Sequence, residues 1–257
     1  MPLPSRSARL RALIQFQPLL GELVDFLLAA ECAGCGRVGA GLCAVCRARL
    51  APSDARGRTP EGRVVHAGTR FDGAAARVIR AAKEQGRTSL LGALDPAVRH
   101  AVHRAAERGG EDGHGGRDGL GGRDGRLPAV DALVPVPTSR AAFRRRGYRV
   151  PEILARRTGF PVLRALAPVR RVADQRGLGR DARRRNVAGS LRARRPGRGL
   201  RVIVVDDVVT TGATLDEAVR ALAAAGFRVV GCVAAAVTPG GRDGAAGPRI
   251  GKVGTRR

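Results

Sequence analysis

The stretch formed by residues 201–214 (RVIVVDDVVTTGAT) constrains the fold more than any other part of the chain. Residues 202–205 are a β-branched, apolar run without a polar face, which predicts a central strand buried on both sides. The run stops at two carboxylates, Asp206 and Asp207, and a threonine-rich loop and a segment with helical apolar spacing follow. This order is typical of an open parallel sheet, in which ligands bind at the carboxyl ends of the strands.

The residue types after the strand favour a ligand with two different ends. A loop that leads into a helix offers unpaired backbone N–H groups and the positive end of the helix dipole, both of which suit a phosphate. Gly212 permits close backbone approach, and Thr210, Thr211 and Thr214 add hydroxyl groups. The adjacent carboxylates instead suit sugar hydroxyls or a hydrated divalent cation. A ribose 5-phosphate has both features.

Two other interpretations of this stretch deserve comparison. A plain strand–helix unit with an acidic turn would need no ligand, but it leaves the paired carboxylates unexplained. A nucleotide-hydrolysing enzyme would need a G-x-x-x-x-G-K-[ST] loop to accompany such a strand. The chain has only two lysines, Lys83 and Lys252, and neither completes that pattern. The sequence therefore excludes this second interpretation.

Residues 202–214 resemble the phosphoribosyl pyrophosphate (PRPP) signature of type I phosphoribosyltransferases, and the chain as a whole resembles their ComF (GntX-like) group. The resemblance implies an α/β fold, a type I phosphoribosyltransferase-like parallel sheet flanked by helices. It also implies that Asp206 and Asp207 are catalytic and hold the ribose hydroxyls of PRPP, with Mg²⁺ bridging ribose and pyrophosphate. The further PRPP-binding residues that it implies in this loop are Val208, Thr210, Thr211, Gly212, Ala213 and Thr214.

A second buried strand is predicted at residues 130–134, and the turn PVPTSR follows it. Two prolines fix an extended turn, which should leave the backbone N–H groups of Val136, Thr138 and Ser139 available. The resemblance implies that this loop holds pyrophosphate. A rigid turn between strand and helix, without a ligand, is the alternative.

Lys83 lies near the end of a predicted helix in residues 71–86, which follows a predicted strand at residues 63–71. The resemblance places this lysine near the pyrophosphate. A solvated position at the helix end, favoured by the helix dipole, explains it equally well.

Four cysteines form two C-x-x-C pairs separated by seven residues, and they are Cys32, Cys35, Cys43 and Cys46. Four thiolates at this spacing predict a tetrahedral zinc site, and Gly36 permits the tight turn after the first pair. Because the protein would fill every coordination position, the zinc should be structural. Disulfides or free thiols are the alternative, and disulfides suit secreted scaffolds better. Cys232 is expected to be buried in a strand at residues 228–237.

The remaining pattern divides the chain into parts. We expect an amphipathic helix and the four-cysteine module in residues 1–50, a linker at 51–62 and the phosphoribosyltransferase-like domain at 63–238. The Gly-rich residues 109–126 should be a disordered insertion, and residues 239–257 a disordered basic tail. No run approaches the roughly 20 apolar residues of a membrane span, so we expect a cytoplasmic protein without membrane contact.

Two further segments resemble elements of the ComF group. Residues 144–148 match its R-G-[FY] element, but Arg149 and Val150 stand where that group has Asn and Gln. Residues 173–191 resemble a mobile flap that closes over bound PRPP, a solvated basic loop being the alternative. The matching positions in this segment are Gln175, Leu178, Arg183 and Asn186.

The formal charge of +25 leaves the partners open. Such a charge favours a polyanion and suggests non-specific DNA contact, but 45 arginines beside two lysines also indicate composition bias. The ComF resemblance suggests a link to competence and DNA uptake with a helicase-like protein partner. Two functions are therefore compared: a phosphoribosyltransferase with an unknown acceptor, and a non-enzymatic PRPP sensor or scaffold.

Overall fold

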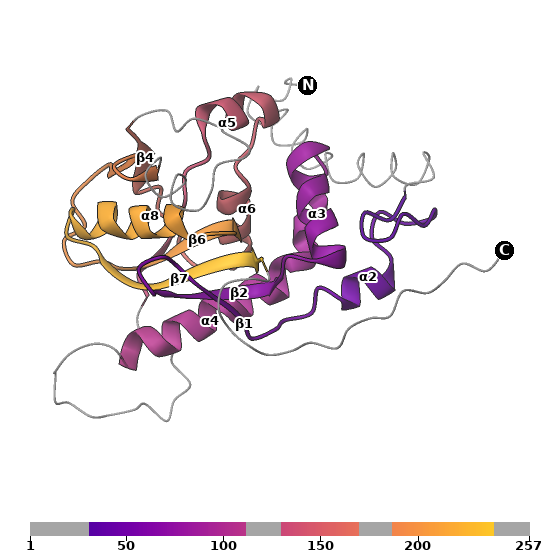
Figure 1. The fold of residues 1–257 in the computed structure, drawn as a ribbon, viewed down its shortest axis with the longest axis horizontal. Coiled ribbons are helices and arrows are strands. Elements are labelled where there is room, and N and C mark those ends of the chain that lie inside the picture. The colour runs from indigo at the N-terminus through magenta and orange to yellow at the C-terminus, as the bar shows by residue number, and fades with distance from the viewer. Residues whose placement is uncertain (1–30, 112–129, 170–186, 239–257) are drawn as a thin grey trace, which may run out of the picture.

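A computed structural model describes residues 31–111, 130–169 and 187–238 (Figure 1). Its centre is a five-stranded sheet in the order β1-β2-β7-β6-β3. Strand β1 pairs with β2 in antiparallel fashion, whereas β2, β7, β6 and β3 run parallel. The strands span Ala55–Arg58 (β1), Val64–Arg70 (β2), Ala132–Pro135 (β3), Arg201–Val209 (β6) and Arg228–Val237 (β7).

Helices cover both faces of this sheet, so the predicted α/β fold class is confirmed. Helices α4 (Asp95–Glu111) and α8 (Ala213–Ala223) lie on opposite sides of it in Figure 1. In β6, Val202 and Val204 pack in one core cluster with residues of α8, while Ile203 and Val205 pack in another with residues of α4. The four side chains are fully buried, as the unbroken apolar run predicts.

Strand β6 is longer than the sequence suggests, because it continues past the two carboxylates to Val209. On one side the pairing with β7 persists, with Asp206 opposite Ala234 and Val208 opposite Ala236. On the other side β3 ends at Pro135, which pairs with Val205. The carboxylates therefore lie inside β6 but beyond the end of its neighbour β3.

The predicted linker at residues 51–62 is wrong in its centre, where Ala55–Arg58 forms the edge strand β1. An edge strand needs little apolar content because its backbone pairs with one neighbour and its outer side meets solvent. Gly57 in this strand fits closely over Val237, whose Cγ2 would lie 2.6 Å from an added Cβ atom. Polar composition alone therefore did not reveal the strand.

The remaining elements surround this frame. Helix α2 (Ala44–Ala48) belongs to the cysteine module, and α3 (Gly73–Glu84) follows β2 as predicted. A 3₁₀ helix, η1 (Thr88–Leu94), comes next and leads into α4, which begins one residue before Pro96. The other elements are α5 (Arg140–Arg146), α6 (Val150–Arg157) and a two-stranded sheet of β4 (Leu166–Pro168) and β5 (Leu191–Ala193).

Several predicted segments lie outside the described residues. These are the N-terminal helix, most of the insertion at 109–126, the tail from residue 239, and the flap positions Gln175, Leu178, Arg183 and Asn186. Helix α4 extends to Glu111 and so includes the first three residues of the predicted insertion. Within the described ranges, every helix is too short or too polar to cross a bilayer.

Candidate active site at the carboxyl end of the sheet

Lys83 of α3 lies beside the two carboxylates of β6, although it precedes Asp207 by 124 positions in the chain. The Nζ atom of Lys83 donates to Asp207 Oδ1 at 2.7 Å, and both side chains are largely buried. An ion pair shielded from water is stronger than one on the surface. The alternative of a purely solvated Lys83 at a helix end is therefore wrong.

Asp206 lies in a different environment although it is the next residue. By solvent-accessible surface the whole residue is half-buried, but its carboxylate group is densely surrounded by protein atoms. Burial, together with the charge of Asp207, raises its pKa from 3.8 to about 7, against the opposing effects of the Asp207 N–H and of Lys83. The N–H group of Asp207 donates to Asp206 Oδ1 at 2.8 Å. A carboxyl that titrates near neutrality beside a charged partner is typical of a functional site.

The loop between β6 and α8 has the backbone form that an anion site requires. Gly212 precedes α8 with φ of 77°, a left-handed conformation that favours glycine. Among the described residues, the backbone N–H groups of Thr211 and Gly212 donate to no protein acceptor. Thr210 is exposed, and Thr211 and Thr214 are half-buried, so their hydroxyl groups line an accessible loop. The loop from Thr210 to Thr214, called the cradle below, thus presents two unpaired backbone N–H groups and three hydroxyl groups beside the N-terminus of α8.

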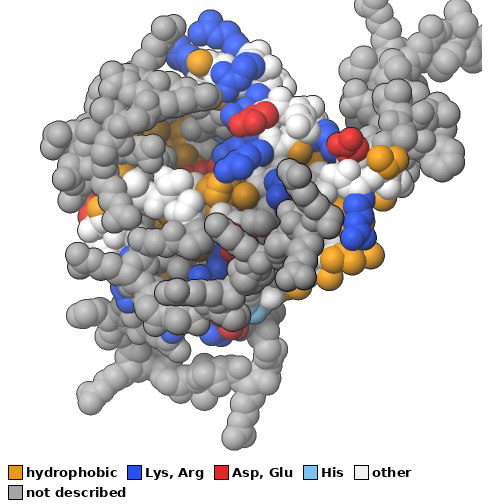
Figure 2. Space-filling model, turned by 45° about the vertical axis from the view of Figure 1, so that its right-hand side comes forward, with side chains coloured by type: hydrophobic (Ala, Val, Ile, Leu, Met, Phe, Trp, Pro, Cys, Tyr) orange, Lys and Arg blue, Asp and Glu red, His pale blue; other side chains and the backbone are white. Residues whose placement is uncertain are grey.

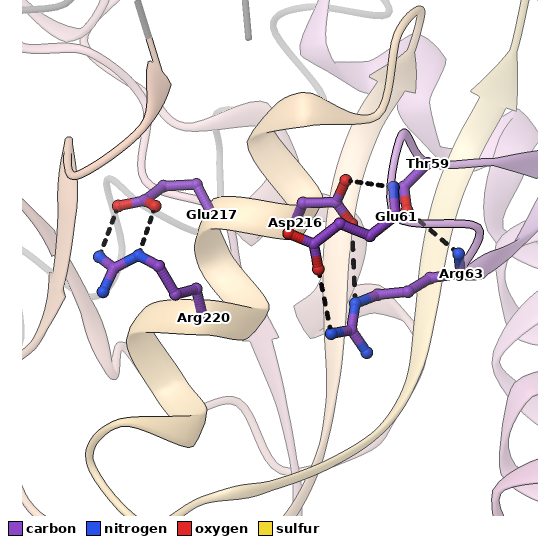
Figure 3. Close-up of polar contacts among 6 residues, drawn as sticks. All are labelled: Thr59, Glu61, Arg63, Asp216, Glu217 and Arg220. Atoms are coloured by element: carbon purple, nitrogen blue, oxygen red, sulfur yellow. Dashed lines mark hydrogen bonds and ion pairs between the residues drawn. The ribbon is translucent and has the colours of Figure 1, made fainter. Parts of the chain in front are cut away.

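The turn between β1 and β2 packs against the start of α8, next to this cradle (Figure 3). An added Cβ atom on Gly212 would lie 2.8 Å from Thr59 Cα, so the two backbones are in close contact. In the first turn of α8, Asp216 accepts from Glu61 N–H at 3.1 Å and lies 3.6 Å from Arg63 Nε. The sequence does not indicate this contact, because it depends on β1, whose polar residues predict a linker.

The loop that follows β3 differs in one respect from its prediction. Val136 is buried, and its N–H group donates to Val205 O at 2.9 Å, so that group is not available to a ligand. The reason is that the β3–β6 ladder extends one residue beyond β3. Ser139 is the N-cap of α5, and its hydroxyl oxygen accepts from Ala142 N–H at 3.2 Å. Thr138 is half-buried and Ser139 is exposed, beside the strand that carries the carboxylates.

The four cysteines of the N-terminal module converge on one point. Their Sγ atoms all lie within 4.8 Å of one another, with 3.8 Å between those of Cys35 and Cys43. Gly36 has φ of 78°, and its N–H group donates to Cys32 O at 2.8 Å, which gives the tight turn predicted after the first pair. Cys43 N–H donates to Cys32 Sγ at 3.3 Å. This donor set fits a tetrahedral metal ion such as zinc.

The two buried thiols of the cluster have opposite acidities. For Cys32, burial opposes ionisation, but N–H donors such as that of Cys43 outweigh it and lower the pKa to about 6. For Cys46, burial and the neighbouring thiols raise the pKa to about 12. The N–H groups around Cys32 therefore favour its thiolate, which is the form in which cysteine binds a metal ion. Cys232, by contrast, is buried in β7, as predicted.

Helix α3 connects the cysteine cluster to the carboxylates. Cys46 and Leu50 share a hydrophobic core with Ala75 and Ile79 of this helix. Arg77 Nε donates to Gly34 O at 2.5 Å in the first cysteine turn. Near the other end of α3, Tyr148 donates its hydroxyl proton to Ala82 O, one residue before Lys83. The helix that carries the site lysine is therefore held from two sides.

Comparison with known proteins identifies part of this arrangement. Residues 142–248 match the family described as "Phosphoribosyl transferase domain". The chain contains a phosphoribosyl transferase domain. The matched residues include β6, α8 and the cradle between them, so the resemblance found in the sequence is confirmed for this domain.

Two curated proteins that are similar to this chain carry the same name, "DNA utilization protein YhgH". The relative from Salmonella typhi is 33% identical over 101 residues, and that from Salmonella typhimurium is 32% identical over 101 residues. In both cases the match covers 37% of this chain and 44% of the relative. The similarity thus spans less than half the length of these proteins.

Proposed function

We propose that this chain is a ComF-type phosphoribosyltransferase-like protein that binds PRPP with Mg²⁺ at the carboxyl end of β6. The Lys83–Asp207 pair carries this proposal, because α3 has brought a cation from a distant part of the chain onto the acidic pair. A plain strand–helix unit would need neither the pair nor the open N–H groups of Thr211 and Gly212. The identified domain supports the same conclusion.

In this proposal each group has one role. Asp206 and Asp207 accept from the ribose hydroxyls, and the loop from Thr210 to Thr214 binds the 5′-phosphate. Lys83 leaves Asp207 and neutralises the pyrophosphate, helped by the N–H groups of Thr138 and Ser139. In a transfer, the bond from the anomeric carbon to pyrophosphate breaks as the acceptor bonds to that carbon. Bound Mg²⁺ would neutralise charge on the leaving pyrophosphate.

We further propose that the four cysteines bind zinc in a structural role. With four protein ligands, no coordination position is open for a substrate or a water molecule. The convergence of the four Sγ atoms within 4.8 Å supports this assignment. Because the module shares a core with α3, the bound ion would stabilise the helix that presents Lys83.

Calorimetric titration with PRPP and Mg²⁺ tests the binding proposal. We expect saturable binding by the natural protein and its loss in the double variant Asp206→Asn with Asp207→Asn. The exposed Asp72 provides a matched control, because Asp72→Asn makes the same chemical change away from β6. Equal affinity in the double variant and the natural protein would refute the site.

A second experiment separates a transferase from a sensor or scaffold. Pyrophosphate release is measured with PRPP and a panel of nucleobases, using the double variant as background. Release above that background supports a transferase. PRPP binding without release from any base supports the sensor, which would act through DNA or a helicase-like protein, in keeping with relatives named for DNA utilization.

A further inference from the structure

A hollow of about 480 Å³ lies beside the loop that follows β3. Neither Asp206 nor Asp207 lines it, but Thr138, whose N–H group is proposed above to bind pyrophosphate, does. Residues of α5, of the loop before it and of the two-stranded sheet β4–β5 form its wall. A neighbouring hollow shares Pro137, Arg149 and Arg194 with it, and Val136 also lines that neighbour. Since Val136 N–H bonds to Val205 O, the paired hollows adjoin the residue before Asp206.

Five arginines line the hollow, and they are Arg140, Arg144, Arg149, Arg192 and Arg194. Within the described part of the chain, none of these five guanidinium groups has a carboxylate partner. Arg194 donates from Nε to Leu166 O at 3.0 Å, which holds it in place without neutralising it. Figure 2 shows Lys and Arg side chains gathered at the top of the molecule, the level at which Figure 1 places α5.

The acidic residue of the neighbouring hollow does not offset this charge. Glu152 is buried there and accepts from Arg156 Nε at 3.0 Å and from Arg164. Burial opposes its ionisation, but these two partners outweigh that effect and hold the pKa of Glu152 below its usual range. Like charges gathered around a concave surface without counter-charge attract an anion. Arginine is especially suited to phosphate because its planar fork binds two oxygens at once.

The wall also offers a flat surface. Arg149 lies with its guanidinium carbon 3.8 Å from the centroid of the Phe143 ring, which forms a cation–π stack. Helix α5, which carries Phe143, has no buried residue, so its side chains are not committed to the core. A stacked guanidinium and ring provide a platform on which a nucleobase can lie.

We propose that this hollow binds a nucleotide, with its phosphate among the arginines and its base on the Arg149–Phe143 stack. A volume of about 480 Å³ is in the range of small-molecule sites, and it suits one nucleotide rather than a duplex. The same chemistry has two sources: a free nucleoside phosphate, or one nucleotide of a single strand. The proposal concerns binding, and it does not depend on PRPP.

Calorimetric titration with AMP and with adenosine tests this site. We expect AMP to bind and adenosine to bind at least about tenfold more weakly, because charged hydrogen bonds to phosphate are lost. The double variant Arg144→Ala with Arg192→Ala, whose side chains are exposed, should lower AMP affinity by at least about tenfold. The matched control is Arg99→Ala with Arg228→Ala, two exposed arginines outside the hollow, which should bind AMP as the natural protein does.

A conservative variant tests the stack separately from the charge. Arg149→Lys keeps the positive charge but loses the planar group. It should therefore weaken the binding of AMP more than it weakens the binding of inorganic pyrophosphate. A short single-stranded oligonucleotide distinguishes the sources. Much tighter binding of the oligonucleotide than of AMP, lost in the Arg144 and Arg192 variant, assigns the site to a strand. Similar affinities assign it to a free nucleotide.

Because AMP carries the ribose 5-phosphate that the PRPP site is proposed to bind, each AMP titration is made in the Asp206→Asn with Asp207→Asn background, where we expect binding at the hollow alone. Two results would overturn the inference. The first is unchanged AMP affinity when Arg144→Ala and Arg192→Ala are added to that background. The second is loss of PRPP binding when Arg144→Ala and Arg192→Ala are made in the natural protein, which would make the hollow part of the PRPP site. The proposed PRPP site fails independently, because it requires PRPP binding by the natural protein and its loss in the Asp206→Asn with Asp207→Asn variant.

Discussion

At the scale of single residues, two neighbouring aspartates have different environments. Asp207 has a cation at 2.7 Å, whereas Asp206 is crowded by protein and by the charge of its neighbour. Sequence reasoning identified both as site residues because carboxylates at the end of an apolar run have no packing role. It could not assign them separate roles, because the distinction comes from Lys83 on another element.

The raised pKa of Asp206 predicts a pH dependence of stability. Folding favours the protonated carboxyl, so its contribution is fully present below about pH 4 and is lost as the pH rises to about 7. An asparagine at this position does not ionise, so Asp206→Asn removes this pH-dependent loss of stability. The variant should therefore unfold at higher urea concentration than the natural protein at pH 8, and the difference should shrink as the pH falls toward 4.

Urea unfolding at a series of pH values between 4 and 8 measures this difference. The same measurement on Asp72→Asn provides the control, since that carboxylate is exposed. Parallel stability curves for Asp206→Asn and the natural protein would contradict the prediction.

At the scale of elements, periodicity predicted the strands and helices with strong apolar patterns. The strand predicted at residues 228–237 has the bounds of β7, and the helix predicted after the cradle is α8. Strand β1 was missed because Ala55–Arg58 carries two arginines and a glycine, and only its pairing with β2 makes it a strand. Tertiary pairing, which no local pattern encodes, decided that element.

The contact between β1–β2 and the cradle gives a prediction at Gly212. An alanine there would be strained by φ of 77°, and its Cβ atom would lie 2.8 Å from Thr59 Cα. Gly226→Ala is a matched control, because Gly226 has φ of 80° but an added Cβ atom would lie 3.9 Å from Arg198 N, an ordinary contact distance. We expect Gly212→Ala to cost about 2–3 kcal/mol of unfolding free energy and Gly226→Ala about 1 kcal/mol.

Chemical denaturation of the two alanine variants measures these losses. Since both carry the same backbone strain, the difference between them isolates the contact with Thr59. Equal losses would show that the turn moves away and does not brace the loop.

At the scale of the whole molecule, the cysteine module packs against the sheet and its helices to form one body. Cys46 and Leu50 are almost fully buried against α3, so no solvent-filled boundary separates the two parts. The spacing of the four cysteines predicted that they would cluster, but it could not predict this shared core. It also did not reveal the arginine hollow, because 45 arginines spread along the chain conceal the five that converge.

Metal removal should therefore affect the stability of the whole protein. With zinc bound we expect one cooperative thermal transition, and a strong chelator should lower its midpoint by at least about 5 °C. Differential scanning calorimetry with and without the chelator measures this shift. Two transitions, with the larger one unchanged by the chelator, would show that the module folds separately.

The turn at residues 59–62 has a practical consequence for shortened proteins. A version that starts at residue 63 would keep every residue of the acidic pair, the cradle and Lys83. It would nevertheless lack Thr59 and Glu61, which lie against Gly212 and Asp216. A shortened protein should therefore begin upstream of Ala55. The residues of the proposed site all lie after residue 63, but the turn that holds them in place lies before it.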